Sequence, residues 1–398
     1  MASVRCTTVV LGAVSLFGGC NCNSEQDFGF PEPVDPVVVD PPSSFGSWLS
    51  FDRSPEGLRP TMSYYDKDRG AVGYAVGVLN DDHTVNWAHE RVAGYPDDAG
   101  LDVADVGRYS AQKTAPDGTV WLAYQNSSTG ALQVSQRMGP SDWSEPVVVD
   151  GGTSQPGVGH WASLALDTAG RPVVAHVDAA NAGVRVSRYD GTGWTTAQVY
   201  AGVAVDQTDY AGVVTTLPAQ VAFTTVVSDG DELLVAFQDV AKGQLHLLRG
   251  SGTTFADEVV DAGAPGSGVG AWPSMRVEGD EVWIAYQDVE HEGLKFAAHT
   301  SAGWALTEVD SAELHGADTA LFVRDGEPSI VYFDGMNNDT WLASRTGGGW
   351  VTAKLGGDEG AVGYHNEVVE VGGVVLAGSY DYTADTLYVT AVEPLAAR

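Results

Sequence analysis

The sequence predicts an all-β fold, a seven-bladed β-propeller, from three observations. A short motif recurs at intervals of about 46 to 61 residues, which is typical of repeat architectures. Each copy has a small or β-branched residue, then Tyr, Phe, His or Ser, one variable residue, and Asp or Asn. The copies end at Asp66, Asn126, Asp178, Asp239, Asp288, Asp334 and Asp381. Short strand patterns with glycine turns surround every copy, and apolar residues at helical spacing are nearly absent.

The stretch 269–312 shows one repeat in full. It begins with Val-Gly-Ala-Trp, has an acidic glycine turn after its first strand, and has a Gly-Trp turn before its last. The expected strands end at Val277, run from Val282 to Tyr286 and from Leu294 to Ala298, and end near Val309. Four short strands with turn residues between them have the size and order of one propeller blade.

The seventh unit, 362–394, has only three expected strands. The missing strand has a counterpart near the N-terminus, because Pro36–Asp40 repeats the sequence of Pro146–Asp150, the expected fourth strand of blade two. We therefore expect the N-terminal strand to complete the last blade and to close the ring without an exposed sheet edge.

The N-terminal residues predict export. Arg5 precedes an apolar stretch that runs into Gly18-Gly19-Cys20, the pattern of a cleaved secretory signal. Cys20 at this junction resembles the lipidated cysteine of bacterial lipoproteins, and ordinary secretion is the alternative. We expect a signal peptide over 1–19, an acidic tether over 20–34 and the propeller over 35–398. The chain would then be a lipoprotein of the bacterial cell envelope, at the outer membrane or cell surface, with this anchor as its one membrane contact.

The formal net charge of −33 excludes several classes of partner. So many carboxylates repel nucleic acid and anionic lipid, so neither is an expected partner. The charge fits a strongly solvated surface; binding of Ca²⁺ by clustered carboxylates is the alternative, with only a weak motif at Asp66-Lys67-Asp68. All three cysteines precede residue 35, which excludes a cysteine-ligated zinc site in the propeller. We expect no cofactor.

Candidate ligand-binding residues lie where each innermost strand begins, which in a propeller is the mouth of the central channel. Aromatic and polar residues there suit sugar binding, since rings stack on C–H faces while polar groups bind hydroxyls. Packing between blades is the alternative role for the aromatic residues. The candidates are Trp48, Arg108, Tyr109, His160, Trp161, Trp272, Asp318 and His365.

The recurring Asp and Asn residues have a structural explanation, because such side chains accept hydrogen bonds from loop amides. Blades six and seven depart from the aromatic pattern with Asp318 and His365, and Glu367 follows closely. A metal site of His160, His315, Asp318 and His365 is conceivable, but ordinary hydrogen bonds account for these histidines and we predict no metal. Two long loops, 94–106 and 203–218, are expected at the same face.

The repeats resemble those of sialidase-like propeller proteins of bacterial surfaces. The resemblance rests on Gly-x-aromatic at the strand starts, on Ser163–Pro172, on the Ala-Tyr-x-Asp strand ends and on the Gly-Trp turns. It implies the fold. Sialidases also carry an arginine triad, a Tyr-Glu pair, an Asp acid and Asp-box turns of the form Ser-x-Asp-x-Gly-x-x-Trp. Here Arg108 is the one arginine expected at the mouth. The stretch Ser187–Trp194 approaches an Asp box, but Asp190 stands one residue later than the Asp of that motif. The resemblance therefore does not imply sialidase activity.

We expect a non-catalytic binding module, a monomer that recognises a glycan or a surface protein. No convincing set of acid, base and nucleophile is recognisable in the sequence. The alternative is a glycoside hydrolase or lyase using Asp318, His365 and Glu367, with one carboxyl as acid and another as base or nucleophile. A purely structural role in the envelope is a further alternative.

Overall fold

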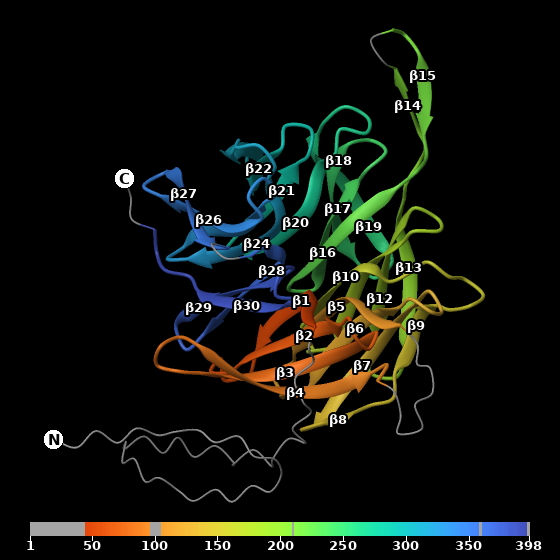
Figure 1. Cartoon of the computed structure of the whole chain (residues 1–398). Helices are drawn as coiled ribbons and strands as arrows, with labels where there is room; N and C mark the ends of the chain where they lie inside the picture. The colour runs from red at the N-terminus through yellow and green to blue at the C-terminus, as the bar shows by residue number, and fades with distance from the viewer. Residues whose placement is uncertain (1–43, 96–104, 209–210, 358–359, 396–398) are drawn as a thin grey trace, which may run out of the picture. The chain divides into compact units, whose positions relative to one another are not determined.

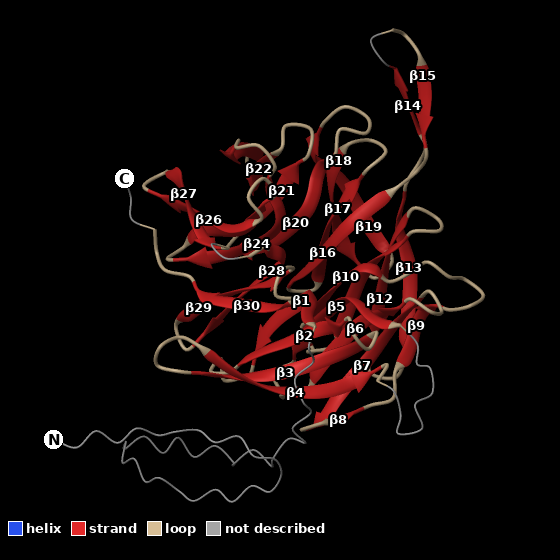
Figure 2. Ribbon diagram, in the orientation of Figure 1, coloured by secondary structure: helices blue, strands red, loops and turns tan. Residues whose placement is uncertain are grey.

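The computed structural model describes residues 44–95, 105–208, 211–357 and 360–395, and these form β-strands and connecting loops without a helix (Figures 1 and 2). The chain divides into two units, Met1–Val34 and Asp35–Arg398, and every described residue belongs to the second. That unit is a seven-bladed β-propeller of small antiparallel sheets, as the sequence predicts. No described segment forms a helix capable of crossing a bilayer.

The first three blades follow the chain from the innermost strand outward. Blade one contains β1 (Phe45–Arg53), β2 (Pro60–Asp66), β3 (Ala71–Leu79) and β4 (Val85–Ala93). Blade two contains β5 (Val106–Thr114), β6 (Val120–Asn126), β7 (Ala131–Gly139), β8 (Asp142–Trp143) and β9 (Val147–Gly151). Blade three contains β10 (His160–Leu166), β11 (Pro172–Asp178), β12 (Gly183–Tyr189) and β13 (Trp194–Ala201).

The remaining blades repeat the pattern after a separate ribbon of β14 (Val205–Thr208) and β15 (Val214–Leu217). Blade four contains β16 (Val221–Asp229), β17 (Glu232–Asp239), β18 (Gln244–Ser251) and β19 (Thr254–Ala262). Blade five contains β20 (Val269–Glu278), β21 (Glu281–Asp288), β22 (Gly293–Thr300) and β23 (Gly303–Asp310). Blade six contains β24 (His315–Arg324), β25 (Glu327–Asp334), β26 (Asp339–Thr346) and β27 (Gly349–Gly356). Blade seven contains β28 (Val362–Val371), β29 (Val374–Asp381) and β30 (Thr386–Ala391).

Two details differ from the sequence-based expectation. The outer strand of blade two is split, because β8 and β9 both pair with β7. The stretch expected as a loop over 203–218 contains the β14–β15 ribbon, which projects away from the blades in Figure 1.

The proposed closing strand, Pro36–Asp40, lies outside the described residues, as do the signal peptide, the tether and Cys20.

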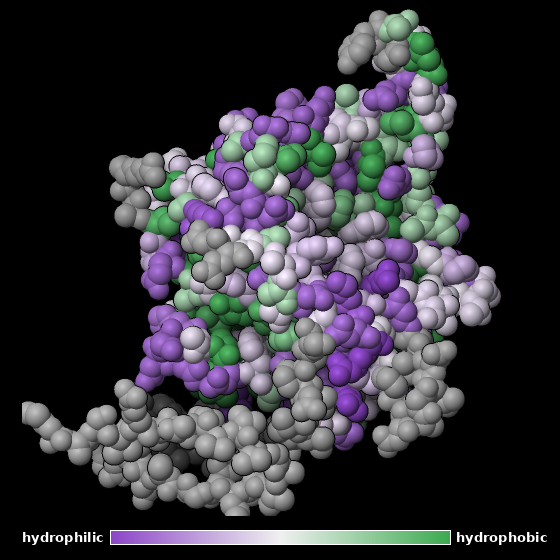
Figure 3. Space-filling model, viewed as in Figure 1, coloured by the Kyte–Doolittle hydropathy of each residue, from purple (hydrophilic) through white to green (hydrophobic). Residues whose placement is uncertain are grey.

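The hydrophobic core consists of layers between neighbouring blades. One cluster joins Leu49 and Met62 of blade one to Val371 and Leu376 of blade seven, so the two ends of the described chain pack together and the ring closes. Similar clusters fill the other interfaces between adjacent blades. Figure 3 shows hydrophilic residues spread over the face in view, in keeping with the excess of carboxylates. Each sheet therefore buries both faces against its neighbours.

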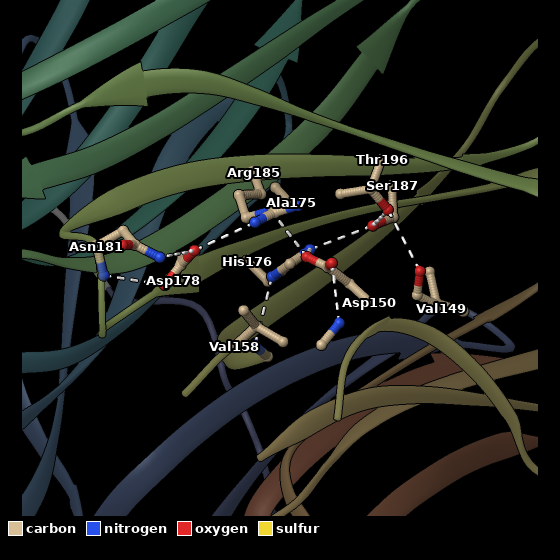
Figure 4. A network of polar contacts seen from close by, with 12 residues as sticks. Val149, Asp150, Val158, Ala175, His176, Asp178, Asn181, Arg185, Ser187 and Thr196 are labelled. Atoms are coloured by element: carbon tan, nitrogen blue, oxygen red, sulfur yellow. Dashed lines mark hydrogen bonds and ion pairs between the residues drawn. The ribbon is translucent and has the colours of Figure 1, made fainter. Parts of the chain in front are cut away.

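Buried charges add polar links between adjacent blades. Glu90 of β4 forms two hydrogen bonds with Arg137 of β7, at 2.5 and 2.9 Å, and accepts a third from Trp143 Nε1 at 3.0 Å. The next interface has an ion pair of 2.8 Å between Asp150 of β9 and Arg185 of β12 (Figure 4). Each carboxylate comes from the outer half of one blade and reaches the middle of the next, so these contacts fix the spacing of the blades.

Candidate functional site

Seven residues, one from each blade, surround the mouth of the central channel, and we call them the mouth ring. They are Trp48, Tyr109, Trp161, Phe223, Trp272, Asp318 and His365. All are half-buried, and together they line a cavity of about 460 Å³. The ring contains four predicted aromatic candidates, Trp48, Tyr109, Trp161 and Trp272, together with Asp318 and His365, and it adds Phe223.

The backbone places these side chains in the same way in every blade. Each mouth-ring residue has a positive φ, from 46° at Trp161 to 56° at Phe223, within an irregular stretch of the inner strand. A glycine usually stands two residues earlier; at Gly107 a Cβ atom would come within 2.8 Å of Val72 in the preceding blade. A left-handed non-glycine residue costs about 1 to 3 kcal/mol, so its recurrence in all blades shows that ring packing maintains it.

The aromatic side chains contact one another around the mouth. Ring centroids lie 4.5 Å apart for His365 and Trp48, 4.3 Å for Trp48 and Tyr109, and 5.4 Å for Tyr109 and Trp161. The series continues through Phe223 to Trp272 at 5.1 and 4.6 Å. Asp318 stands between Trp272 and His365. These rings therefore pack on each other across neighbouring blades and keep some surface open to the cavity.

Hydrogen bonds between the innermost strands follow a period of two blades. Blades one, three and five each have Trp in the mouth ring and Ser two residues later. The Ser hydroxyl oxygens accept backbone N–H groups of the following blade: Ser50 from Gln112, Ser163 from Val226, and Ser274 from Leu321. Hydroxyls of the following blade donate back: Ser110 to the Trp48 carbonyl, Thr224 to that of Trp161, and Thr319 to that of Trp272. Blade seven has no counterpart in this pairing.

Blade seven accordingly carries different side chains at the same positions. Asn366 replaces the hydroxyl residue, and its Nδ2 donates to the Asp318 carbonyl at 3.0 Å, while Ser379 donates to its Oδ1 at 2.5 Å. Glu367 stands where blades one, three and five have Ser, and it lines both the mouth and the channel below. The unpaired seventh blade therefore brings an acidic group into a layer otherwise made of small side chains.

The titratable groups at the mouth are shifted toward their neutral forms. Burial raises the pKa of Asp318 to about 7, although the backbone N–H of His365 acts in the opposite direction. Burial also raises the pKa of Glu367 to about 7, against the opposing charges of Lys113 and Arg276. Burial lowers the pKa of His365 to about 4. These side chains keep some surface in the channel, so the cause is enclosure by the channel walls.

Asp318→Asn is expected to make the protein relatively more stable as the pH rises. The Asp318 carboxyl ionises near its ordinary pKa of 3.8 when unfolded and near 7 when folded. Between these values the folded state holds more protons, so the contribution of Asp318 to stability falls as the pH rises. Asn cannot ionise, so the urea midpoint of the variant should match that of the wild type near about pH 4 and exceed it near about pH 8. Asp142→Asn, at an exposed position of the short strand β8, is the control. Parallel curves for wild type and D318N would contradict the shift.

The other predicted residues lie in two different places. Arg108 forms a 3.0 Å ion pair with Asp105, and His160 Nδ1 lies 3.4 Å from the Tyr109 hydroxyl. Both line a neighbouring groove of about 450 Å³ that shares Tyr109 with the mouth. His315, in contrast, is buried between blades five and six, 2.8 Å from Asp310 and 3.3 Å from Asp334. His315 is therefore separated from the other predicted histidines, and within the described ranges no group of three His, Cys, Asp or Glu side chains has an arrangement that could hold a metal ion.

The recurring Asp and Asn residues act as the sequence predicts. Asp178 Oδ1 accepts the backbone N–H of Asn181 at 3.0 Å, and Asp239 Oδ1 accepts that of Lys242 at the same distance. Equivalent bonds hold the corresponding loops of the other blades. These residues shape the hairpin loops.

Sequence reasoning missed Phe223 as a mouth-ring residue, because Val221 stands two residues before it in place of glycine. Its aromatic character at the start of a strand was the available signal.

No protein-family model and no curated protein sequence matches the chain. Among solved structures it is similar to the polysaccharide lyase Uly1, with a TM-score of 0.52 and 9% identity over 89% of this chain and 90% of the lyase. It also matches a Hadza microbial sialidase, Hz136 (TM-score 0.49, 14% identity, 78% of this chain), and a Penicillium chrysogenum α-L-arabinanase (0.48, 11%, 72% of this chain and 92% of that one). The chain spans 66% of the length of the sialidase. At such identities the likeness shows the propeller fold alone.

Proposed function

We propose that the propeller is a binding module that holds a glycan in the mouth ring. The observation that supports this most is the continuous series of half-exposed aromatic rings around one cavity of about 460 Å³. Aromatic faces offer flat apolar surface to the C–H groups of a sugar. Asp318, His365 and Glu367 lie beside them and offer groups that hydrogen-bond to hydroxyls. A surface protein that inserts a side chain into the mouth is the alternative partner.

The electrostatics favour binding over catalysis. A pair of catalytic carboxyls commonly has one pKa raised and the other low, so that one group acts as an acid while its partner is ionised. Here burial raises the pKa values of Asp318 and Glu367 alike, to about 7. At neutral pH each is partly protonated, and in that form each donates and accepts hydrogen bonds. Two similar carboxyls suit hydroxyl recognition better than a division into acid and nucleophile.

Replacing mouth-ring tryptophans should strongly weaken glycan binding. A glycan that binds is first identified by array screening. We expect Trp161→Ala and Trp272→Ala each to lower the affinity for this glycan by about 30-fold or more, the loss expected for a buried aromatic contact. Trp350→Ala is the matched control, since Trp350 lies on β27 and packs on Phe296 away from the mouth. The protein is screened with and without Ca²⁺, and urea unfolding verifies that each variant is folded. Binding that survives both mouth substitutions would contradict the proposed site.

A second candidate function is hydrolysis or lyase cleavage of a glycan. The observation in its favour is that two carboxyls with pKa values of about 7 line one cavity, where either could transfer a proton at neutral pH. Incubation with a polysaccharide panel, followed by chromatography of the products, tests it directly. Product that disappears in Glu367→Gln and Asp318→Asn would establish an enzyme, while unchanged chains with retained binding favour the module.

We also propose that the chain is exported and anchored through lipid on Cys20, as the Gly18-Gly19-Cys20 junction suggests. Cys20→Ala should abolish incorporation of a labelled fatty acid and release the propeller from the membrane fraction. Cys22→Ala is the matched control and should retain both. Equal labelling of the Cys20→Ala variant would refute lipidation at this residue.

A further inference from the structure

Two basic side chains face the interior of the channel below the mouth ring. Lys113 of β5 and Arg276 of β20 each stand four residues after the mouth-ring residue of their own strand, Tyr109 and Trp272. They therefore lie at the same depth on different sides of the channel. Both line a partly open space of about 530 Å³, which we call the channel cavity.

Neither base has a carboxylate partner within ion-pair distance among the described residues. Within the described part of the chain, the Arg276 guanidinium makes one hydrogen bond, from Nη1 to the carbonyl of Met275 at 2.9 Å, and its side chain lines the cavity. Most other described lysines and arginines pair with acids, as Arg137, Arg185 and Lys295 do. Two unpaired bases in one cavity are unexpected in a chain with 53 acids and 20 bases.

Four acids, Asp52, Glu278, Glu367 and Glu370, and a third base, Arg53, also line the cavity. Arg53, Glu278 and Glu370 are exposed, which leaves Glu367 and Asp52 as the half-buried acids there. Glu367 lines the same cavity, but burial raises its pKa to about 7, so it is partly neutral there. Asp52 also lines the cavity, and one of its oxygens accepts the backbone N–H of Thr114 at 2.5 Å. Burial lowers the pKa of Arg276, although the charge of the nearby Glu367 acts in the opposite direction, so the site disfavours the charged guanidinium. An anion in the cavity would relieve that cost.

We propose that the channel cavity binds an oxyanion between Arg276 and Lys113. The space accommodates a small carboxylate or sulfate, and the guanidinium presents a planar pair of donors that fits either group. The ammonium group of Lys113 adds a second charge, and a protonated Glu367 adds an O–H donor. The anion is either a free ion or the acidic group of a sugar whose ring lies in the mouth above.

Calorimetric titration tests the site with two probes, sodium acetate and sodium glucuronate, at constant ionic strength. We expect saturable binding of at least one probe to the intact protein. Arg276→Gln and Lys113→Gln should weaken it by about tenfold or more, as expected for a lost hydrogen bond to a charged group, whereas Arg276→Lys should keep part of it. Arg188→Gln is the matched control, because Arg188 is half-buried and lies on β12 outside the cavity.

The outcomes separate the two sources of the anion. Tighter binding of glucuronate than of acetate, with only the glucuronate affinity lowered by Trp161→Ala, assigns the anion to a sugar acid in the mouth. Equal affinities assign it to a free ion. Absence of saturable binding for both probes, or equal binding by wild type and by folded Arg276→Gln and Lys113→Gln variants, would overturn the proposal. The acetate measurement needs no glycan, so it is independent of the proposed glycan site.

Discussion

Glu90→Ala is expected to lower the free energy of unfolding by about 3 to 5 kcal/mol, the cost of leaving a buried charge without its partner. The Glu90 side chain is 2% exposed, and that of Arg137 is 19% exposed. Its two carboxylate oxygens accept hydrogen bonds from Arg137 and from the indole N–H of Trp143. Truncation leaves both donors enclosed between blades one and two. Urea unfolding followed by tryptophan fluorescence measures the change.

A matched surface pair provides the control for Glu90→Ala. Glu232 and Arg249 lie 3.3 Å apart, but their side chains are 51% and 35% exposed, so Glu232→Ala should change stability by less than about 1 kcal/mol. Replacing Glu90 and Arg137 together by Met should recover much of the loss, since it removes the stranded charge as well. A similar, small effect for Glu90→Ala and Glu232→Ala would show that water reaches the buried pair.

The number and order of the blades could be predicted from sequence because each blade repeats the same short motif, whose residues contact one another within the blade. Asp178 and Asp239 shape hairpin loops through bonds to amides three residues away, so their recurrence is visible in a linear chain. The positions of the mouth-ring residues follow in the same way from the starts of the inner strands. Contacts of short range along the chain leave a pattern in the sequence, and here that pattern located most of the candidate site.

Contacts between blades leave a weaker pattern in the sequence. His315 makes ordinary polar contacts, as expected, but no spacing along the chain indicates that Asp310 and Asp334 hold it between two blades, away from the mouth. The unpaired state of Arg276 depends on which groups six other blades bring into the channel, and no spacing along one strand reveals it. The Trp-x-Ser pattern of blades one, three and five is present in the sequence. Its role in joining neighbouring blades is revealed only by the hydrogen bonds of Ser50 and its equivalents.

Deleting residues 1–43 is expected to destabilise the propeller by roughly 3 kcal/mol or more, whereas deleting residues 1–34 should leave stability unchanged. The comparison rests on the repeated Pro-Val-Val-Val-Asp sequence: in blade two the Val147–Gly151 strand pairs with β7, and Val149 packs into the core. If Val37–Asp40 pairs with β30 in the same way, its removal loses one buried valine, about 1.5 to 3 kcal/mol, and several backbone hydrogen bonds of about 0.5 to 1.5 kcal/mol each.

The described part of blade seven shows where such a strand would fit. Every residue of β30 is half-buried, and a groove of about 470 Å³ beside it is lined by Phe45, Trp87, Leu387 and Val389. Deletion of residues 1–43 would leave the edge of β30 open to pairing with a second chain, so the longer deletion should aggregate during size-exclusion chromatography while the shorter one stays monomeric. Equal stability of the two truncated proteins would mean that the hydrophobic contacts between blades one and seven close the ring without a fourth strand.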